Sequence, residues 1–307
     1  MNRKKITILD GGMGRELERR GAPFKQPQWS AVALAESPEI VKSVHKAFID
    51  SGAHIITTNS YALVPFHLGE ERFKTQSGAL AERAGKLARL AVEESGADVR
   101  VAGSIPPLFG SYRPDLFQPE RVEEIAGLLI HSMAPYVDFW ICETQSLIEE
   151  SLRVKELLDS TGSSKPVWVS FTLKDDIMNK EPRLRSGESV AEAVRAMAAE
   201  NVGAVLFNCC RPESIGAAVK VAADTLKKQE ARQTEIGAYA NAFPPQPKNA
   251  VANSSLNIIR ADLTADVYLD QAREWHKNGA TILGGCCGIG PEHIAALAEA
   301  FTPTSQV

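Results

Sequence analysis

The sequence predicts an α/β protein, a single-domain (β/α)8 TIM barrel that extends over residues 1–307. Eight short apolar runs rich in β-branched residues recur along the chain, and longer segments with helical spacing separate them. Strands that alternate with helices indicate parallel βα units, and eight units in roughly 250–300 residues match this barrel. A doubly wound open sheet is the alternative. It normally carries a glycine-rich nucleotide-binding first turn, and GGMGREL lacks the third glycine.

Each expected strand is a β-branched or aromatic run bounded by polar or glycine residues. In chain order they are ITILDGG (6–12), HIITTNS (54–60), VRVAGSI (99–105), DFWICET (138–144), PVWVSFT (166–172), AVLFNCC (204–210), IGAYANA (236–242) and ATILGGCC (280–287). Helices are expected to begin where proline takes the first helical position, as in Ser37-Pro38, Gln118-Pro119 and Gly290-Pro291. Helices are expected to end before glycine, at Gly52, Gly203 and Gly279.

Composition excludes several classes of protein. Apolar residues make up 44% and charged residues 23% of the chain, which is ordinary for a globular protein. The net charge of −4 gives no nucleic-acid footprint. No apolar stretch reaches the length of a secretory signal or a membrane span. Five cysteines in 307 residues suggest reduced thiols in a cytoplasmic protein, not a disulfide scaffold. The expected partners are small-molecule substrates.

The polar and reactive residues fall at the C-terminal ends of the expected strands. In a TIM barrel this is where the active site lies. The residues are Asp10, Gly11, Gly12, Thr58, Asn59, Tyr61, Ser104, Glu143, Asn208, Cys209, Cys210, Asn241, Cys286 and Cys287.

Four cysteines form two adjacent pairs, Cys209-Cys210 and Cys286-Cys287. Neighbouring cysteines rarely bridge each other because the geometry is strained, whereas thiols from two strand ends can meet on one soft metal ion. Three thiolates and an open position would make a zinc site that activates a further ligand. Both cysteines of the second pair can point inward among glycines. One of the first pair must point away, because strand neighbours alternate faces.

Zinc coordination would explain how such a site activates sulfur. A free thiol has a pKa of about 8.5 and is mostly protonated at neutral pH, but coordination to a metal deprotonates it. The product is a nucleophilic thiolate that needs no general base. Buried apolar cysteines are the alternative, and Cys142 fits that description best.

Asp10 and Glu143 are candidates for binding a substrate ammonium group, because carboxylates at apolar strand ends are costly to bury unpaired. A structural salt bridge with Arg15 or Arg113 is the alternative. The two glycines after Asp10 leave backbone amides open, which suits a carboxylate. Together these groups would bind an amino acid. Trp29 and Tyr61 are either core aromatics or faces for a cationic methyl donor.

The chain resembles the homocysteine S-methyltransferases, including their betaine, S-methylmethionine and cobalamin-dependent branches. The matching pieces are DGGMGRELE (10–18), WSA (29–31), TTNSY (57–61), AGS (102–104), ET (143–144), FNC (207–209), GGCCG (284–288) and PEHI (291–294). The resemblance implies a (β/α)8 barrel with catalytic zinc on Cys209, Cys286 and Cys287, and leaves Cys210 outside the ligand set. It also implies that Asp10 and Glu143 bind the amino-acid end of homocysteine.

These features predict zinc-dependent transfer of a methyl group from a methyl onium donor to the thiolate of L-homocysteine, which gives methionine. S-Methylmethionine and S-adenosylmethionine are the favoured donors. Betaine, a methylated corrinoid protein, and a non-catalytic zinc-binding barrel are the alternatives. Three segments near the expected donor side depart from the family: Arg15 stands where threonine is usual, IPPLFGSYRPDLF follows AGS, and YANAFPPQP replaces a YPN pattern. The predicted substrate-binding residues are Asp10, Gly11, Gly12, Trp29, Tyr61, Glu143 and Asn208.

Overall fold

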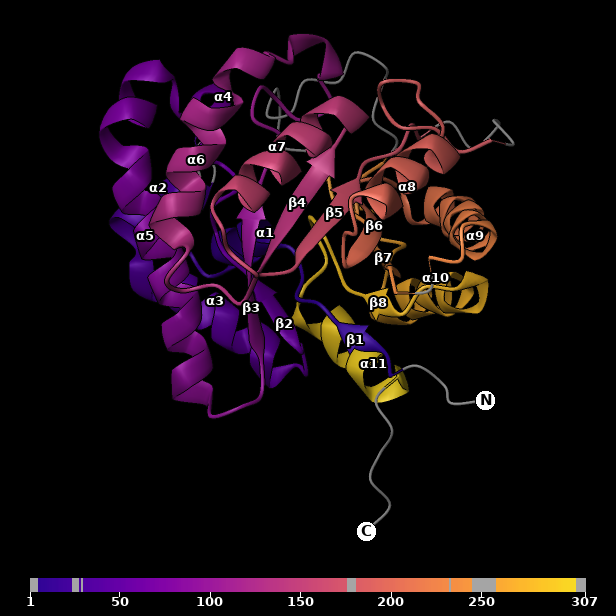
Figure 1. The fold of residues 1–307 in the computed structure, drawn as a ribbon. Coiled ribbons are helices and arrows are strands. Elements are labelled where there is room, and N and C mark those ends of the chain that lie inside the picture. The colour runs from indigo at the N-terminus through magenta and orange to yellow at the C-terminus, as the bar shows by residue number, and fades with distance from the viewer. Residues whose placement is uncertain are drawn as a thin grey trace.

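Eight parallel strands form one sheet in the computed structural model, which describes residues 5–23, 28, 30–175, 181–231, 233–244 and 258–301. The strand order is β1-β8-β7-β6-β5-β4-β3-β2, and the helices surround the strands (Figure 1). The strands are β1 (Thr7–Ile8), β2 (Ile55–Thr57), β3 (Arg100–Ile105), β4 (Phe139–Gln145), β5 (Val167–Phe171), β6 (Ala204–Asn208), β7 (Glu235–Tyr239) and β8 (Ile282–Leu283). All eight predicted strands are present.

Contacts between the first two strands close the sheet into a barrel. Leu9 bridges Ile55 in parallel register. The His54 N–H donates to the Ile8 carbonyl at 2.8 Å, and the Asp10 N–H donates to the Ile55 carbonyl at 3.0 Å. The predicted (β/α)8 barrel is therefore confirmed, and the open-sheet alternative is wrong.

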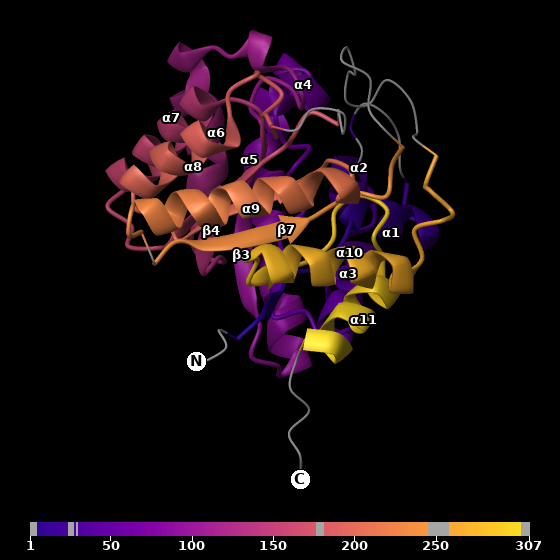
Figure 2. The same ribbon diagram turned by 90° about the vertical axis from the view of Figure 1, so that its right-hand side faces the viewer.

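The helices pack outside the strands and against each other in chain order. In Figure 2, α9 and α10 lie side by side, with β7 visible between them. The α-helices are α1 (Met13–Arg19), α2 (Ser30–Glu36), α3 (Pro38–Asp50), α4 (Pro65–Leu68), α5 (Glu70–Ser95), α6 (Val122–Met133), α7 (Ile148–Ser160), α8 (Val190–Ala199), α9 (Pro212–Lys228), α10 (Ala265–Asn278) and α11 (Pro291–Phe301). Two 3₁₀ helices, η1 (Pro114–Leu116) and η2 (Pro119–Arg121), precede α6. Among the described residues, no helix has the length and apolar character needed to cross a membrane.

Most of the predicted helix boundaries hold. Pro38 and Pro291 begin α3 and α11, and Pro119 begins the 3₁₀ turn that leads into α6. Gly52 and Gly279 follow their helices with positive φ, as expected. Gly203 was expected to play the same part after α8, but Asn201 adopts the left-handed conformation there instead, with φ of 53°. Asparagine tolerates this conformation better than most residues.

The barrel interior is a layer of side chains separate from the core between strands and helices. Its buried members are Leu9, Ile55, Ala102, Phe139, Ile141, Trp168, Ala204, Leu206, Tyr239 and Ile282, with Cys286 packed against them. Arg100, at the N-terminal end of β3, stacks on Phe139 with 5.1 Å from guanidinium carbon to ring centroid. The apolar layer ends at Tyr239 and Cys286, which marks the level at which the barrel mouth begins.

Candidate metal and substrate site

A pocket opens at the C-terminal ends of the strands. Its lining includes Asp10, Gly11, Gly12, Arg15, Tyr61, Tyr112, Glu143, Asn208, Cys209, Phe243, Cys286 and Cys287. The fold thus brings the described members of the predicted site into one pocket. Trp29, also predicted, lies outside the described residues.

Three thiols from two strand ends converge in this pocket. The Cys286 Sγ lies 3.3 Å from the Cys209 Sγ and 4.0 Å from the Cys287 Sγ, and all three sulfurs lie within 4.8 Å of one another. In a tetrahedral site with metal–sulfur bonds of about 2.3 Å, neighbouring sulfurs are roughly 3.8 Å apart. The three thiols therefore fit one metal ion with small side-chain adjustments.

Backbone conformation separates Cys209 from its neighbour Cys210. Cys209 has φ of 53°, in the left-handed region that non-glycine residues rarely adopt. This turn ends the strand alternation and directs Cys209 into the pocket, whereas the Cys210 side chain is fully buried in the outer core. Burial raises the pKa of the Cys210 thiol above its usual range, and raises that of Cys142 to about 12. Both are uncharged packing residues.

The two glycines after Asp10 let the first loop pack directly on the loop that carries Cys286 and Cys287. A Cβ on Gly12 would lie 2.5 Å from the Cys286 carbonyl oxygen, and one on Gly11 would lie 2.4 Å from the Ile289 carbonyl oxygen. The Gly12 N–H donates to that Ile289 carbonyl at 2.8 Å. The Gly12 amide is therefore already used within the protein, which corrects the expectation that it is open to a carboxylate.

Gly12→Ala is expected to destabilise the protein, because the added methyl group would push the first and last loops apart. Overpacking of this kind typically costs about 1–3 kcal/mol of unfolding free energy, and the displaced Cys286 loop should bind metal more weakly. Gly127→Ala is the matched control. Gly127 lies inside α6 with open space around its Cα, so alanine there should stabilise by about 0.5–1 kcal/mol. Chemical denaturation of both variants measures the two effects, and equal effects would contradict the packing role of Gly12.

Asp10 is buried and Glu143 is half-buried, and both carboxylates accept hydrogen bonds from neutral groups. Asp10 accepts the Thr57 N–H at 2.7 Å and the Thr57 hydroxyl at 3.0 Å. Glu143 accepts the Ser104 hydroxyl at 2.6 Å and the Tyr239 hydroxyl at 3.0 Å. These bonds orient both carboxylates without supplying a positive charge.

Burial strongly disfavours the charged forms of these two groups. It raises the pKa of Asp10 to about 8, and the nearby Glu143 adds to that increase. It also raises the pKa of Glu143 to about 7. A positively charged ligand between them would reverse both shifts, because an opposite charge favours the ionised carboxylate. The pocket is thus prepared for a cation such as an ammonium group.

The arginines considered as salt-bridge partners have other ion pairs. Arg113 pairs with Asp115 at 2.6 Å near the surface. Arg15 lines the pocket and pairs with Glu18 at 2.6 Å, and its guanidinium carbon lies 5.9 Å from the centroid of the Phe243 ring. The hydrogen bonds on Asp10 and Glu143 described above come from other residues, so the structural salt-bridge alternative is not supported.

Asn208 lines the pocket, but its side chain is bound to neighbouring strands. Its Oδ1 accepts the Thr144 N–H at 3.0 Å and the Ser170 hydroxyl at 2.8 Å, and its Nδ2 donates to the Thr144 Oγ1 at 2.9 Å. Thr144 has φ of 56°, a costly conformation for a β-branched residue. Asn208 therefore holds the turn directly after Glu143, and its contact with the substrate stays a prediction.

Two hydroxyl groups that shape the site were not among the predicted site residues: those of Thr57 and Tyr239, which orient the carboxylates. Tyr112, whose segment is predicted to line the barrel mouth, lines the pocket and donates to the Cys209 carbonyl at 3.2 Å. Tyr239 ends β7 opposite Asn208 in the strand register, so an inward-facing hydroxyl could have been inferred once that register was known. The predicted Tyr61 lines the pocket and shares a 2.6 Å hydrogen bond with Ser111.

Comparison with known proteins agrees with this geometry. A family model described as homocysteine S-methyltransferase matches residues 7–301. A selenocysteine Se-methyltransferase from Brassica oleracea var. italica is 29% identical over 95% of this chain and 87% of its own length. A homocysteine S-methyltransferase from Escherichia coli strain K12 is 28% identical over 97% of this chain and 96% of its own.

A solved structure also covers nearly the whole chain. It is that of the homocysteine methyltransferase MmuM from Escherichia coli in a metallated form, which is 30% identical and superposes with a TM-score of 0.75. The match covers 97% of each chain. An oxidised form of the same protein gives a TM-score of 0.76. The barrel described above is therefore shared along its whole length with a protein that has been observed with metal.

Proposed function

Because the chain belongs to the homocysteine S-methyltransferase family, we propose that it transfers a methyl group from a methyl onium donor to the thiolate of homocysteine, which gives methionine. We further propose that the metal is zinc and that one barrel domain contains the whole site. The observation that carries the proposal is the presence of three convergent thiols and two carboxylates in one pocket. A pure metal store would need only the thiols.

Cys209, Cys286 and Cys287 would hold the ion. Three soft thiolates favour zinc among common divalent ions, and three protein ligands leave a fourth position for substrate. When bound, zinc would keep the acceptor sulfur deprotonated and nucleophilic. The role of the protein is then to hold that sulfur at a fixed position in the barrel mouth.

Asp10 and Glu143 would bind the ammonium group of the acceptor. The charge of the ammonium compensates the cost of ionising two carboxylates inside the pocket, and the hydroxyls of Thr57, Ser104 and Tyr239 keep them oriented. We propose that the acceptor carboxylate lies beside Gly11, because the Gly12 N–H already donates to the Ile289 carbonyl. Amino-acid acceptors would thus be distinguished from simple thiols by their charged end.

Methyl transfer would need no proton acceptor on the protein. The thiolate electron pair forms the new sulfur–carbon bond, and the electrons of the breaking bond return to the donor heteroatom, which loses its positive charge. Aromatic faces attract such a cation without a full counter-charge that would trap it. Tyr61, Tyr112 and Phe243 line the pocket in positions suited to this task.

We expect S-methylmethionine to be turned over faster than betaine at equal concentration. The thioether released from a sulfonium is a better leaving group than the tertiary amine released from a quaternary ammonium, and an aromatic pocket suits the diffuse charge of the sulfonium. The measurement is methionine formation by zinc-replete protein with homocysteine and a panel of donors: S-methylmethionine, S-adenosylmethionine, betaine and a methylated corrinoid protein. Use of a methylated corrinoid protein alone would favour the corrinoid alternative, and no transfer from any donor would favour a non-catalytic zinc-binding barrel.

The arginines provide the control for this donor assignment. Arg15 lines the pocket, whereas Arg113 pairs with Asp115 near the surface. If betaine were the true donor, its carboxylate would need a fixed cation, and Arg15→Ala would reduce betaine turnover while Arg113→Ala would not. Faster turnover of betaine that depends on Arg15 would overturn the sulfonium assignment and leave the thiolate chemistry in place.

A further inference from the structure

Cys209 is held in its unusual conformation by hydrogen bonds to its carbonyl group. The hydroxyls of Tyr112 and Thr172 both donate to this oxygen, each at 3.2 Å. A left-handed conformation at a non-glycine residue is unfavourable and persists only when surrounding contacts determine it. The position of the Cys209 sulfur therefore depends on the groups that hold its carbonyl.

Tyr112, one of these donors, is itself strained. It has φ of 67°, and its ring is covered by Arg185, whose guanidinium carbon lies 4.7 Å from the ring centroid. The Arg185 side chain is only 7% exposed, and a cation over an aromatic ring is attracted most strongly when desolvated. Arg185 thus fixes the ring plane from which the hydroxyl reaches Cys209.

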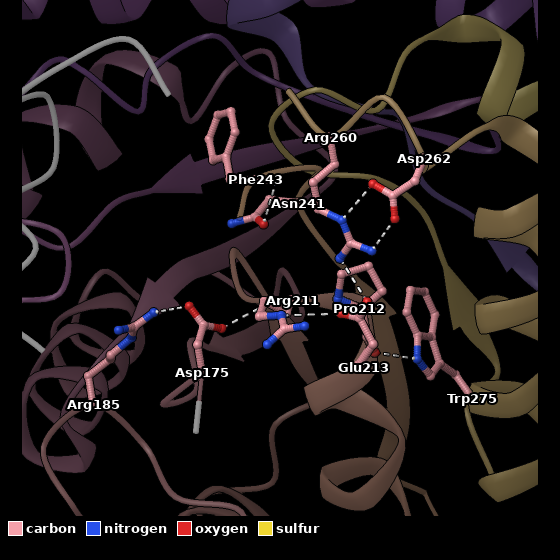
Figure 3. A network of polar contacts seen from close by, with 10 residues as sticks. All are labelled: Asp175, Arg185, Arg211, Pro212, Glu213, Asn241, Phe243, Arg260, Asp262 and Trp275. Carbon is pink, nitrogen blue, oxygen red and sulfur yellow. Dashed lines mark hydrogen bonds and ion pairs between the residues drawn. The ribbon is translucent and has the colours of Figure 1, made fainter. Parts of the chain in front are cut away.

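Arg185 is fixed in turn by a buried carboxylate. Asp175 accepts its Nη2 at 3.0 Å, with 3% of the aspartate side chain exposed. The other Asp175 oxygen accepts the Arg211 N–H at 3.0 Å, and Arg211 follows Cys209 by two residues. Figure 3 shows Asp175 between the guanidinium of Arg185 and the backbone of Arg211. The Arg185–Asp175 ion pair is therefore connected to the turn at Cys209 in two ways: Arg185 contacts Tyr112, and Asp175 binds the backbone of Arg211.

The segment from Cys209 to the start of α9 is also held by contacts on the side opposite Asp175. Arg260 donates to Glu213 at 2.7 Å and pairs with Asp262 at 2.7 Å, and the Trp275 indole donates to the Pro212 carbonyl at 3.2 Å (Figure 3). These contacts hold the start of α9, so the segment from Cys209 to Pro212 has little freedom on that side. Arg185 and Asp175 secure the remaining side, which faces Tyr112.

We propose that Arg185 is a positioning residue for the metal ligand Cys209, acting through Tyr112. A buried ion pair is often no more stabilising than an apolar pair of similar volume. A contribution to overall stability therefore does not explain why Arg185 and Asp175 are present at this position. A planar guanidinium can stack on a ring and bind a carboxylate at the same time, which lysine cannot match. The inference rests on the proposed function, because it concerns how tightly the three thiols hold their ion.

The test compares zinc release from wild-type protein and from the double variant Asp175→Asn/Arg185→Met. This variant removes both buried charges together, and asparagine keeps an oxygen for the Arg211 N–H. Transfer of zinc to a chromophoric chelator should become about tenfold faster, as expected for loss of a desolvated cation–π contact. Arg153→Met, which breaks an exposed pair with Glu156, should leave the release rate unchanged.

Tyr112→Phe distinguishes positioning from a general structural role and serves if the double variant does not fold. Loss of the hydroxyl should also speed zinc release several-fold. Adding the Asp175→Asn/Arg185→Met change to Tyr112→Phe should then have less than a twofold further effect, since both act on the same carbonyl. Fully additive effects, or a release rate unchanged by Tyr112→Phe, would overturn the inference. Wild-type protein that binds no zinc would instead overturn the proposed function.

Discussion

Cys286→Ala and Cys287→Ala will each abolish tight metal binding and methyl transfer. Two thiolates cannot replace three in holding zinc with one open position, and without the ion the acceptor thiol would return to its mostly protonated state. The sulfurs of Cys209, Cys286 and Cys287 lie within 4.8 Å of one another, so each is close enough to be a ligand. Metal content of the purified reduced protein, measured by mass spectrometry, should be about one zinc per chain and near zero in both variants.

Cys210→Ala is the matched control, since it removes a neighbouring thiol that is fully buried in the outer core. Losing one buried sulfur should cost about 1 kcal/mol of stability or slightly more, while zinc content and activity remain. Loss of zinc from the Cys210 variant with retention in Cys209→Ala would show that the other thiol of the pair is the ligand.

Glu143→Gln will weaken the use of homocysteine by ten- to a hundredfold while zinc stays bound. A hydrogen bond to a charged group is worth roughly 1.5–3 kcal/mol, and the amide keeps the shape of the side chain but not its charge. The Ser104 and Tyr239 hydroxyls that orient Glu143 remain in place. Steady-state kinetics with homocysteine varied at saturating donor measure the change.

The stability of the same variant tests whether Glu143 is instead a structural residue. Burial raises its pKa from 4.5 to about 7, so the folded protein holds the proton more tightly than the unfolded chain does. Glu143 therefore destabilises the fold increasingly as the pH rises from about 4 through 7. Glu143→Gln should unfold at equal or higher temperature than wild type at pH 8. A marked loss of stability with unchanged homocysteine kinetics would contradict the binding role.

The fold followed from periodicity because a parallel barrel repeats one unit eight times. Each strand is buried on both faces and reads as a short apolar run, and proline and glycine mark the helices between them. The exception at Gly203 arises because a glycine before a strand can be needed for packing. A Cβ on Gly203 would lie 2.9 Å from the Trp168 indole nitrogen.

The residues of the site could be predicted where residue type and position at a strand end are sufficient to identify them. Cysteines and carboxylates at strand ends pointed to the pocket, and the family resemblance selected Cys209 over Cys210. Backbone strain was not predictable, because positive φ at Cys209 and Thr144 depends on contacts between distant strands. For the same reason the hydrogen bonds by which Asn208 holds the Thr144 turn were not predicted: its partners Thr144 and Ser170 lie on other strand ends.

The closure of the barrel has a consequence for the order in which the protein matures. Thr7 pairs with Ile282, a separation of 282 − 7 = 275 residues, and the first loop packs on the loop of Cys286. Contacts this distant in sequence form late in folding, since chain entropy opposes them until most of the structure exists. During synthesis, Cys209 emerges well before its partner thiols. A nascent chain therefore lacks the assembled thiol cluster, so uptake of the proposed zinc ion would occur only once the barrel is complete.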